Sequence, residues 1–122
     1  MQTRRVFAFL GAAGMITGGL VAATAAPALA SCSHAHSDKD STVGYITGTD
    51  AGVRPGPHYI SPNACTPVYY ALRGYAAEYQ CYTTGDTYQG WSTWTWAYVP
   101  ALGRSGWIND YLLSGNGSNY AC

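Results

Sequence analysis

Few side chains in this chain could do acid–base, metal or nucleophilic chemistry. The three histidines and the single glutamate are His34, His36, His58 and Glu78. A hydrolase needs a nucleophile beside a base, a pair of carboxylates or a metal, and the sequence contains no Gly-x-Ser-x-Gly motif. His34 and His36 precede Asp38 and Asp40, but their spacing is not that of a closed zinc site. We therefore expect a protein that is not an enzyme and that holds neither a metal nor a cofactor.

The other reactive side chains are the cysteines Cys32, Cys65, Cys81 and Cys122. An even number of cysteines in a short exported chain is typical of a disulfide framework. Three pairings are possible. We predict Cys65–Cys81, which would join neighbouring segments of a sheet, and Cys32–Cys122, which would tie the two ends together. Each bridge would stabilise the fold by about 2–4 kcal/mol, largely by restricting the unfolded chain.

Residues 1–30 have the three parts of an export signal. Adjacent arginines, Arg4 and Arg5, precede a mildly apolar run, and Ala28-Leu29-Ala30 supplies the small residues that a signal peptidase requires. Paired arginines are typical of the twin-arginine route, and a general secretory signal is the alternative. We therefore predict a signal peptide at 1–30 and a secreted, extracellular product that begins at Ser31.

Cys32 has an alternative fate as a lipid anchor. The sequence Leu29-Ala30-Ser31-Cys32 is similar to the box at which bacterial lipoproteins are cleaved and acylated. Acylation of Cys32 would leave an odd number of cysteines, and an unpaired thiol is a liability in an oxidising compartment. A disulfide at Cys32 is therefore favoured, and a lipoprotein anchored through Cys32 stays the alternative.

The segment 31–122 has the length of one small domain and an unusual content of aromatic rings. It holds four basic and six acidic side chains, a net charge of −2, which argues against nucleic acid or an anionic membrane as a partner. It also holds all eleven tyrosines and all four tryptophans. Such rings suit both small β cores and binding surfaces.

Segments rich in β-formers, separated by turn residues, predict an all-β domain at 42–113. The clearest strand is 94–99, where Trp94, Trp96 and Tyr98 alternate with smaller residues. The other predicted strands are 43–47, 68–72, 77–83 and 106–108, with a helical turn at 109–113. The predicted loops are 48–64 and 84–92. The flanking segments 31–41 and 114–122 are polar, so we expect a flexible arm and a linker-like tail.

Several parts of 42–113 resemble a bacterial Src-homology-3-like (SH3b) domain. Val53-Arg54-Pro55-Gly56-Pro57 fits the Val-Arg-x-Gly-Pro signature that this family has after its first strand, although Gly52 stands where the family usually has asparagine. The resemblance implies a small SH3-like β-barrel, here stapled by disulfides. The residues expected to be structural are Arg54, Gly56, Pro57, Gly106 and Trp107. Strand alternation is expected to bury Tyr45, Tyr79, Trp94 and Trp107 in the core.

The resemblance also implies a binding module. Exported SH3b modules bind cell-wall (peptidoglycan) peptides or other extracellular peptides and proteins, so we expect such a partner, no nucleic acid, no membrane after signal cleavage, and a monomer. The expected ligand-binding residues are Tyr59, Tyr88, Trp91 and Tyr111. Arg54 is expected to brace the loop beneath them by donating hydrogen bonds to loop carbonyls.

An alternative from another class is a small disulfide-stapled effector such as a protease inhibitor. Its bait would be the proline-rich loop from Pro55 to Pro67, because prolines hold a loop rigid and reduce the entropy lost on binding.

Overall fold

Strands dominate the part of the chain that the computed structural model describes, residues 32–122. They are β1 (Val43–Tyr45), β2 (Asp50–Val53), β3 (Tyr69–Leu72), β4 (Ala76–Tyr88), β5 (Trp91–Val99) and β6 (Arg104–Asn109). Two short 3-10 helices follow, η2 (Asp110–Leu112) and η3 (Ser114–Asn116). The predicted all-β class is therefore confirmed, and so is the helical turn after the last strand. The predicted signal peptide, 1–30, lies outside the described residues.

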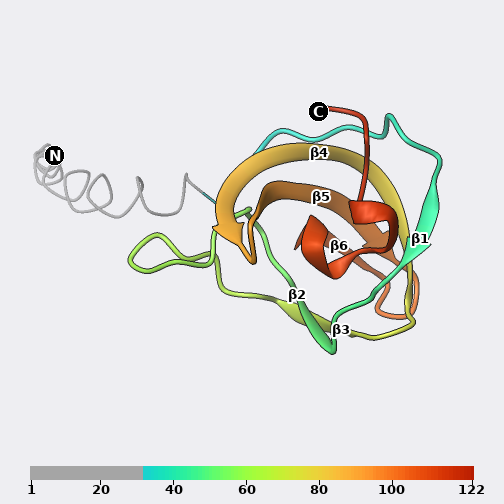
Figure 1. The fold of residues 1–122 in the computed structure, drawn as a ribbon, viewed down its shortest axis with the longest axis horizontal. Helices are drawn as coiled ribbons and strands as arrows, with labels where there is room; N and C mark the ends of the chain where they lie inside the picture. Colours follow the sequence, from blue (N-terminus) through green and yellow to red (C-terminus); the bar gives the residue numbers. More distant parts are fainter. Residues whose placement is uncertain (1–31) are drawn as a thin grey trace, which may run out of the picture. The chain divides into compact units, whose positions relative to one another are not determined.

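The strands form two antiparallel sheets. The larger has the order β1-β4-β5-β6, and β2 pairs with β3 in the smaller one. Figure 1 shows β4 and β5 bent into arcs, with β2 and β3 on the side toward which the arcs open. Arg54, just after β2, exchanges two backbone hydrogen bonds with Trp107 of β6, at 3.0 and 2.8 Å. This short bridge joins the smaller sheet to the last strand of the larger one.

The β4–β5 hairpin is longer than the sequence predicts. Residues 84–92 were expected to form a loop, but β4 continues to Tyr88 and β5 begins at Trp91. Gln89 and Gly90 make the turn with φ of 52° and 83°, the left-handed values that a tight two-residue hairpin turn requires. The prediction failed because the end of β4 is polar and its register shifts between Thr84 and Tyr88, which hides the alternation.

Strand β2 was also missed. Its residues were assigned to a loop because Gly52 and Asp50 favour turns, yet β2 pairs in register with β3. Ala51 and Val53 of β2 are fully buried, so the tertiary packing of two small apolar side chains outweighs the local turn preference.

The core lies between the two sheets. Its buried members are Ile46, Ala51, Val53, Ala71, Ala77, Tyr79, Ala97, Val99, Ile108 and Leu113. Of the rings expected in the interior, Tyr79, Trp94 and Trp107 are buried, whereas Tyr45 is 55% exposed. The prediction for Tyr45 is wrong because the inward positions of this segment are Gly44, whose Cα packs on the Tyr79 ring, and Ile46.

Two disulfides are present, as predicted, but the predicted pairing is wrong. Cys32 bonds to Cys65, with Cα atoms 5.6 Å apart, and Cys81 bonds to Cys122, with Cα atoms 4.9 Å apart. Each bridge ties a terminal segment to the body of the domain and does not link two strands. The Cys32 sulfur is engaged in its disulfide, so this structure gives no support to lipidation at that sulfur.

The expected flexible arm, from Cys32 onward, is an extended segment that packs against the larger sheet. The His36 ring stacks on Trp96 with centroids 3.7 Å apart, and the backbone N–H of Lys39 donates to Gln80 of β4 at 2.8 Å. These contacts cover a ring on the outward face of β5 and hold the arm against β4.

The C-terminal tail is likewise part of the domain and does not form a linker. Its backbone pairs with Tyr82 of β4: Tyr82 N–H donates to Tyr120, and Cys122 N–H donates to Tyr82. Ser118 is 4% exposed. The tail therefore adds a short parallel partner to β4.

Candidate functional site

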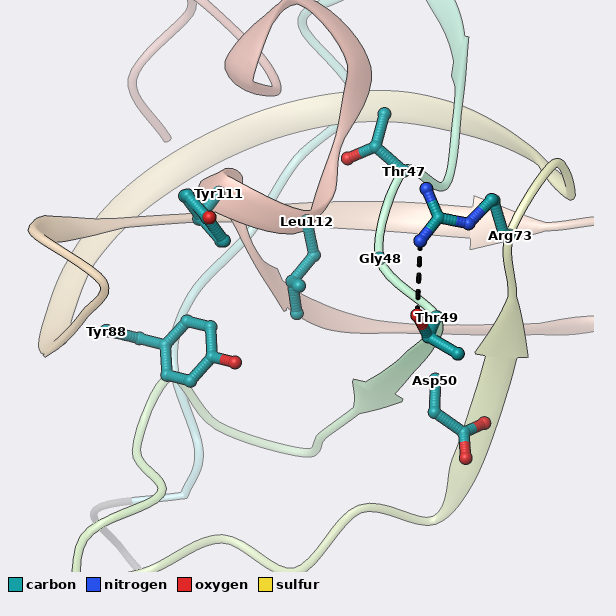
Figure 2. Close-up of a pocket in the computed structure, with 8 residues that line it drawn as sticks. All are labelled: Thr47, Gly48, Thr49, Asp50, Arg73, Tyr88, Tyr111 and Leu112. Atoms are coloured by element: carbon teal, nitrogen blue, oxygen red, sulfur yellow. Dashed lines mark hydrogen bonds between the residues drawn. The ribbon is translucent and has the colours of Figure 1, made fainter.

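Two adjoining cavities form one groove beside the 3-10 helix η2. They have volumes of about 650 and 110 Å³ and share Asp50, Tyr88 and Leu112 in their walls. We call this surface the tyrosine groove. Its aromatic and apolar lining consists of Tyr59, Tyr70, Tyr88, Tyr111, Trp94 and Leu112, and its charged lining consists of Asp50, Arg54 and Arg73. Figure 2 shows the larger cavity, with Tyr88 and Tyr111 on one side and Asp50 and Arg73 on the other.

Three of the four predicted ligand-binding residues meet in this groove. The rings of Tyr59 and Tyr88 pack edge to face with centroids 5.4 Å apart, and those of Tyr88 and Tyr111 have centroids 6.0 Å apart. The Tyr59 hydroxyl donates to the carbonyl of Thr87 at 2.9 Å. Edge contacts of this kind fix the orientation of the rings while part of each ring stays accessible.

Tyr111 is presented by a capped 3-10 turn. Its backbone N–H donates to Asn109 Oδ1 at 2.9 Å, and Asn109 Nδ2 donates to the carbonyl of Trp91 at 3.0 Å. The buried Asn109 side chain thus connects η2 to the β4–β5 hairpin. Tyr111 itself is 48% exposed, so its ring is held at the rim of the groove.

Asp86 fixes the long loop that supplies Tyr59. One carboxylate oxygen accepts from the backbone N–H groups of Tyr59 and Ile60, and the other lies 3.0 Å from His58 Nδ1. Partial burial opposes ionisation of Asp86, but the hydrogen bonds from His58 and the two backbone groups outweigh it and lower the pKa of Asp86. The main-chain carbonyl of Asp86 also accepts from Trp94 Nε1 at 2.9 Å. One residue therefore holds both the loop and the ring at the base of the groove.

The charged side chains of the groove have different tasks. Arg54 Nη1 donates to the carbonyl of Cys65 at 2.8 Å, which is the loop-bracing contact expected from the sequence, and burial lowers the pKa of Arg54. Arg73 Nη2 donates to Thr49 Oγ1 at 3.1 Å. Asp50 and Arg73 are both exposed, so the groove offers a carboxylate and a guanidinium to a ligand.

Trp91 does not belong to this cluster. It lines a separate open cavity of about 400 Å³ with Tyr82, Asp110 and residues of the C-terminal tail, and it is 37% exposed. The expected grouping of Trp91 with Tyr59 and Tyr88 is therefore not what the fold produces. Their place in one expected loop suggested the grouping. Tyr88 and Trp91 are in fact paired at the turn end of the β4–β5 hairpin, yet they line different cavities.

The expected structural residues lie at close contacts. Gly56 packs against Cys32 and the Cys65 sulfur, and Gly106 packs against Val53, so a side chain at either glycine would collide with these neighbours. Trp107 is fully buried, and Pro57 accepts a backbone hydrogen bond from Asp86 at 3.0 Å. These residues position the groove without lining it.

Sequence reasoning missed Tyr70, Arg73 and Asp50 as groove residues. A signal for Tyr70 was present, because a strand with period two must expose one of the adjacent rings Tyr69 and Tyr70. Asp50 and Arg73 gave no signal. Asp50 is the first residue of β2 and Arg73 follows β3, and of this strand pair only β3 was predicted.

Among residues 32–122, no group of three or more His, Cys, Asp or Glu side chains is placed to hold a metal ion. No helix in the same range has the length and apolarity needed to cross a bilayer. Comparison with family models, curated proteins and solved structures found no match to this chain.

Proposed function

We propose that this protein is an exported, non-enzymatic binding module that holds an extended peptide in the tyrosine groove, with bacterial cell-wall peptides as the favoured ligands. The observation that supports this most directly is the convergence of Tyr59, Tyr88 and Tyr111 from three separate segments onto one groove. Grooves lined by several rings are a recurring means of gripping extended peptides.

The rings are suited to such binding because their own contacts already hold them in place. A tyrosine has few rotatable bonds, so little side-chain entropy remains to be lost when a ligand covers it. The exposed guanidinium of Arg73 can bind a carboxylate of the ligand, and the exposed carboxylate of Asp50 can bind an amine of the ligand. Wall peptides offer both groups, which favours them over a purely apolar ligand.

An SH3b-like identity is part of the proposal. The order of parts supports it: the Val53–Pro57 loop is tied to β6 through Arg54, and Tyr111 follows β6 in a 3-10 turn beside the groove. Two disulfides fit an oxidising compartment outside the cytoplasm, in agreement with an export signal at 1–30.

Co-sedimentation with purified cell walls tests the proposal. Tyr88→Ala and Tyr111→Ala should each weaken sedimentation about tenfold or more, the loss typical of a ring at the centre of an interface. Tyr45→Ala is the matched control, because Tyr45 is 55% exposed but lies outside the groove. Full retention of binding by both groove variants, or an equal loss in the control, would refute a peptide site in the groove.

A second candidate function, protease inhibition, is favoured by the loop that carries Ile60. Ile60 is 52% exposed, and the loop is fixed on one side by Asp86 and on the other by the Cys32–Cys65 disulfide. A rigid loop with an exposed apolar side chain suits the substrate cleft of a protease. An inhibition assay against serine proteases with the wild-type protein and with Ile60→Ala tests this function. Inhibition by the wild type that is lost in Ile60→Ala would support it, and absence of inhibition by the wild type, or equal inhibition by both, would refute it.

A further inference from the structure

The cavity that contains Trp91 is built differently from the tyrosine groove. It lies between the larger sheet and the C-terminal tail, and we call it the tail cleft. Its lining is Tyr82, Trp91, Thr93, Asp110, Gly115, Asn116, Ser118 and Asn119. No lysine, arginine or aliphatic side chain is among these residues, so the cleft offers rings, hydroxyls, amides and one carboxylate.

Asp110 forms the floor of the tail cleft and is 2% exposed. Its two carboxylate oxygens accept from Thr95 Oγ1 at 2.6 Å and from Thr93 Oγ1 at 2.7 Å. Because the Thr93 hydroxyl proton is directed to Asp110, the Thr93 oxygen is left as an acceptor on its other side. Each carboxylate oxygen can also accept a further hydrogen bond.

The tail supplies a wall with two exposed amides, Asn116 and Asn119. Neither side chain makes a hydrogen bond to another described residue. The backbone between them is fixed, because Ser118 N–H donates to Thr95 Oγ1 at 2.9 Å and Ser118 Oγ donates to Asp40 Oδ2 at 2.7 Å. The amides therefore extend from a held backbone and keep their donors and acceptors for a ligand.

The aromatic side of the tail cleft is the partly exposed indole of Trp91, with the half-buried ring of Tyr82 beside it. The main-chain carbonyl of Trp91 accepts a hydrogen bond from Asn109, which anchors the backbone from which the indole extends. A flat ring next to convergent hydroxyl, amide and carboxylate groups matches the surface of a sugar ring. One face of a sugar ring presents C–H groups that pack on the π-face of an aromatic ring, and its rim presents hydroxyls that both donate and accept.

We propose that the tail cleft is a binding site for a neutral saccharide, with Trp91 as the stacking platform and Asn116, Asn119, Thr93 and Asp110 as hydrogen-bond partners for its hydroxyl groups. The Asp110 carboxyl and the absence of cationic side chains from the lining disfavour an anionic sugar. The cleft also lacks an apolar pocket for peptide side chains. This site is separate from the tyrosine groove, so the protein would contact peptide and glycan through different surfaces.

Titration calorimetry of the secreted, disulfide-intact protein with short soluble oligomers of N-acetylglucosamine, glucose and mannose tests the proposal. We expect at least one oligomer to bind, and Trp91→Ala to weaken that binding about tenfold or more. Asn116→Ala/Asn119→Ala should weaken it as well. Tyr111→Ala should leave it unchanged, because Tyr111 lines the tyrosine groove and does not line the tail cleft.

The absence of binding by every oligomer at millimolar concentration would overturn the proposal. Binding that survives both cleft variants, or that is lost in Tyr111→Ala alone, would overturn it too. If Trp91→Ala fails to fold, the double asparagine variant decides the matter, since both amides are exposed and make no hydrogen bond within residues 32–122. Wall sedimentation of the tyrosine variants is a separate measurement, so failure of the peptide site and failure of the saccharide site are distinguishable.

Discussion

Asp110 should make the stability of this protein depend on pH in an unusual direction. Burial raises the pKa of Asp110 from 3.8 to about 6, although hydrogen bonds from Thr95 and Thr93 partly offset the effect. The folded protein therefore holds a proton on Asp110 at pH 5, whereas the unfolded chain has mostly released it. The stabilising contribution is fully present below pH 3.8 and is lost as the pH rises through about 6.

The size of the effect follows from the shift of the pKa. A change of about two pK units corresponds to roughly 3 kcal/mol, because each unit is worth about 1.36 kcal/mol. Asp110→Asn cannot ionise. The free energy of unfolding of wild type relative to this variant should therefore fall by roughly 2.5 kcal/mol between pH 4 and pH 7, because a small part of the total is already lost at pH 4. Urea unfolding of both proteins at several pH values in this range gives that difference, and other titrating groups cancel in it.

A carboxylate with the opposite shift provides the control. The pKa of Asp86 is lowered, so its contribution to stability is present above pH 3.8 and is lost as the pH falls through the pKa of the folded state. The advantage of wild type over Asp86→Asn should therefore shrink in acid, whereas its advantage over Asp110→Asn should grow. A difference between wild type and Asp110→Asn that does not change from pH 4 to pH 7 would refute the assigned burial of the Asp110 carboxyl.

Two further predictions concern the segments that hold the fold together. The disulfides close separations of 33 and 41 residues. Removing either one, in Cys32→Ser/Cys65→Ser or in Cys81→Ser/Cys122→Ser, should therefore lower the free energy of unfolding by about 3–4 kcal/mol. Denaturant unfolding of both variants measures this, and a loss of stability in only one of them would contradict the prediction. Arg54→Ala should lower the free energy of unfolding by about 1–2 kcal/mol, because the carbonyl of Cys65, a residue that is 1% exposed, then loses its donor. An unchanged melting temperature for the arginine variant would show that the contact does not brace the loop.

The amino-acid sequence was sufficient for features that depend on local chemistry. The greater part of strand β5, residues 94–99, could be predicted because its rings alternate with smaller residues there. An all-β domain with two disulfides followed from turn residues, β-formers and an even number of cysteines. Tyr59, Tyr88 and Tyr111 were also named from the sequence, together with Trp91, because rings in or beside expected loops are candidates for binding. The fold brings the three tyrosines to one groove and leaves Trp91 outside it.

The tertiary structure alone decided which distant segments meet. The disulfide pairing depends on the arm lying beside Cys65 and the tail lying beside Cys81, and neither placement leaves a pattern in the sequence. The same cause separates Trp91 from the tyrosines: the tail, which looks like a linker by composition, packs against β4 and builds a second cavity around Trp91. Local propensity reports only the preferences of neighbouring residues, whereas these contacts join residues far apart in the chain and are stabilised by burial and hydrogen bonds that form only in the folded state.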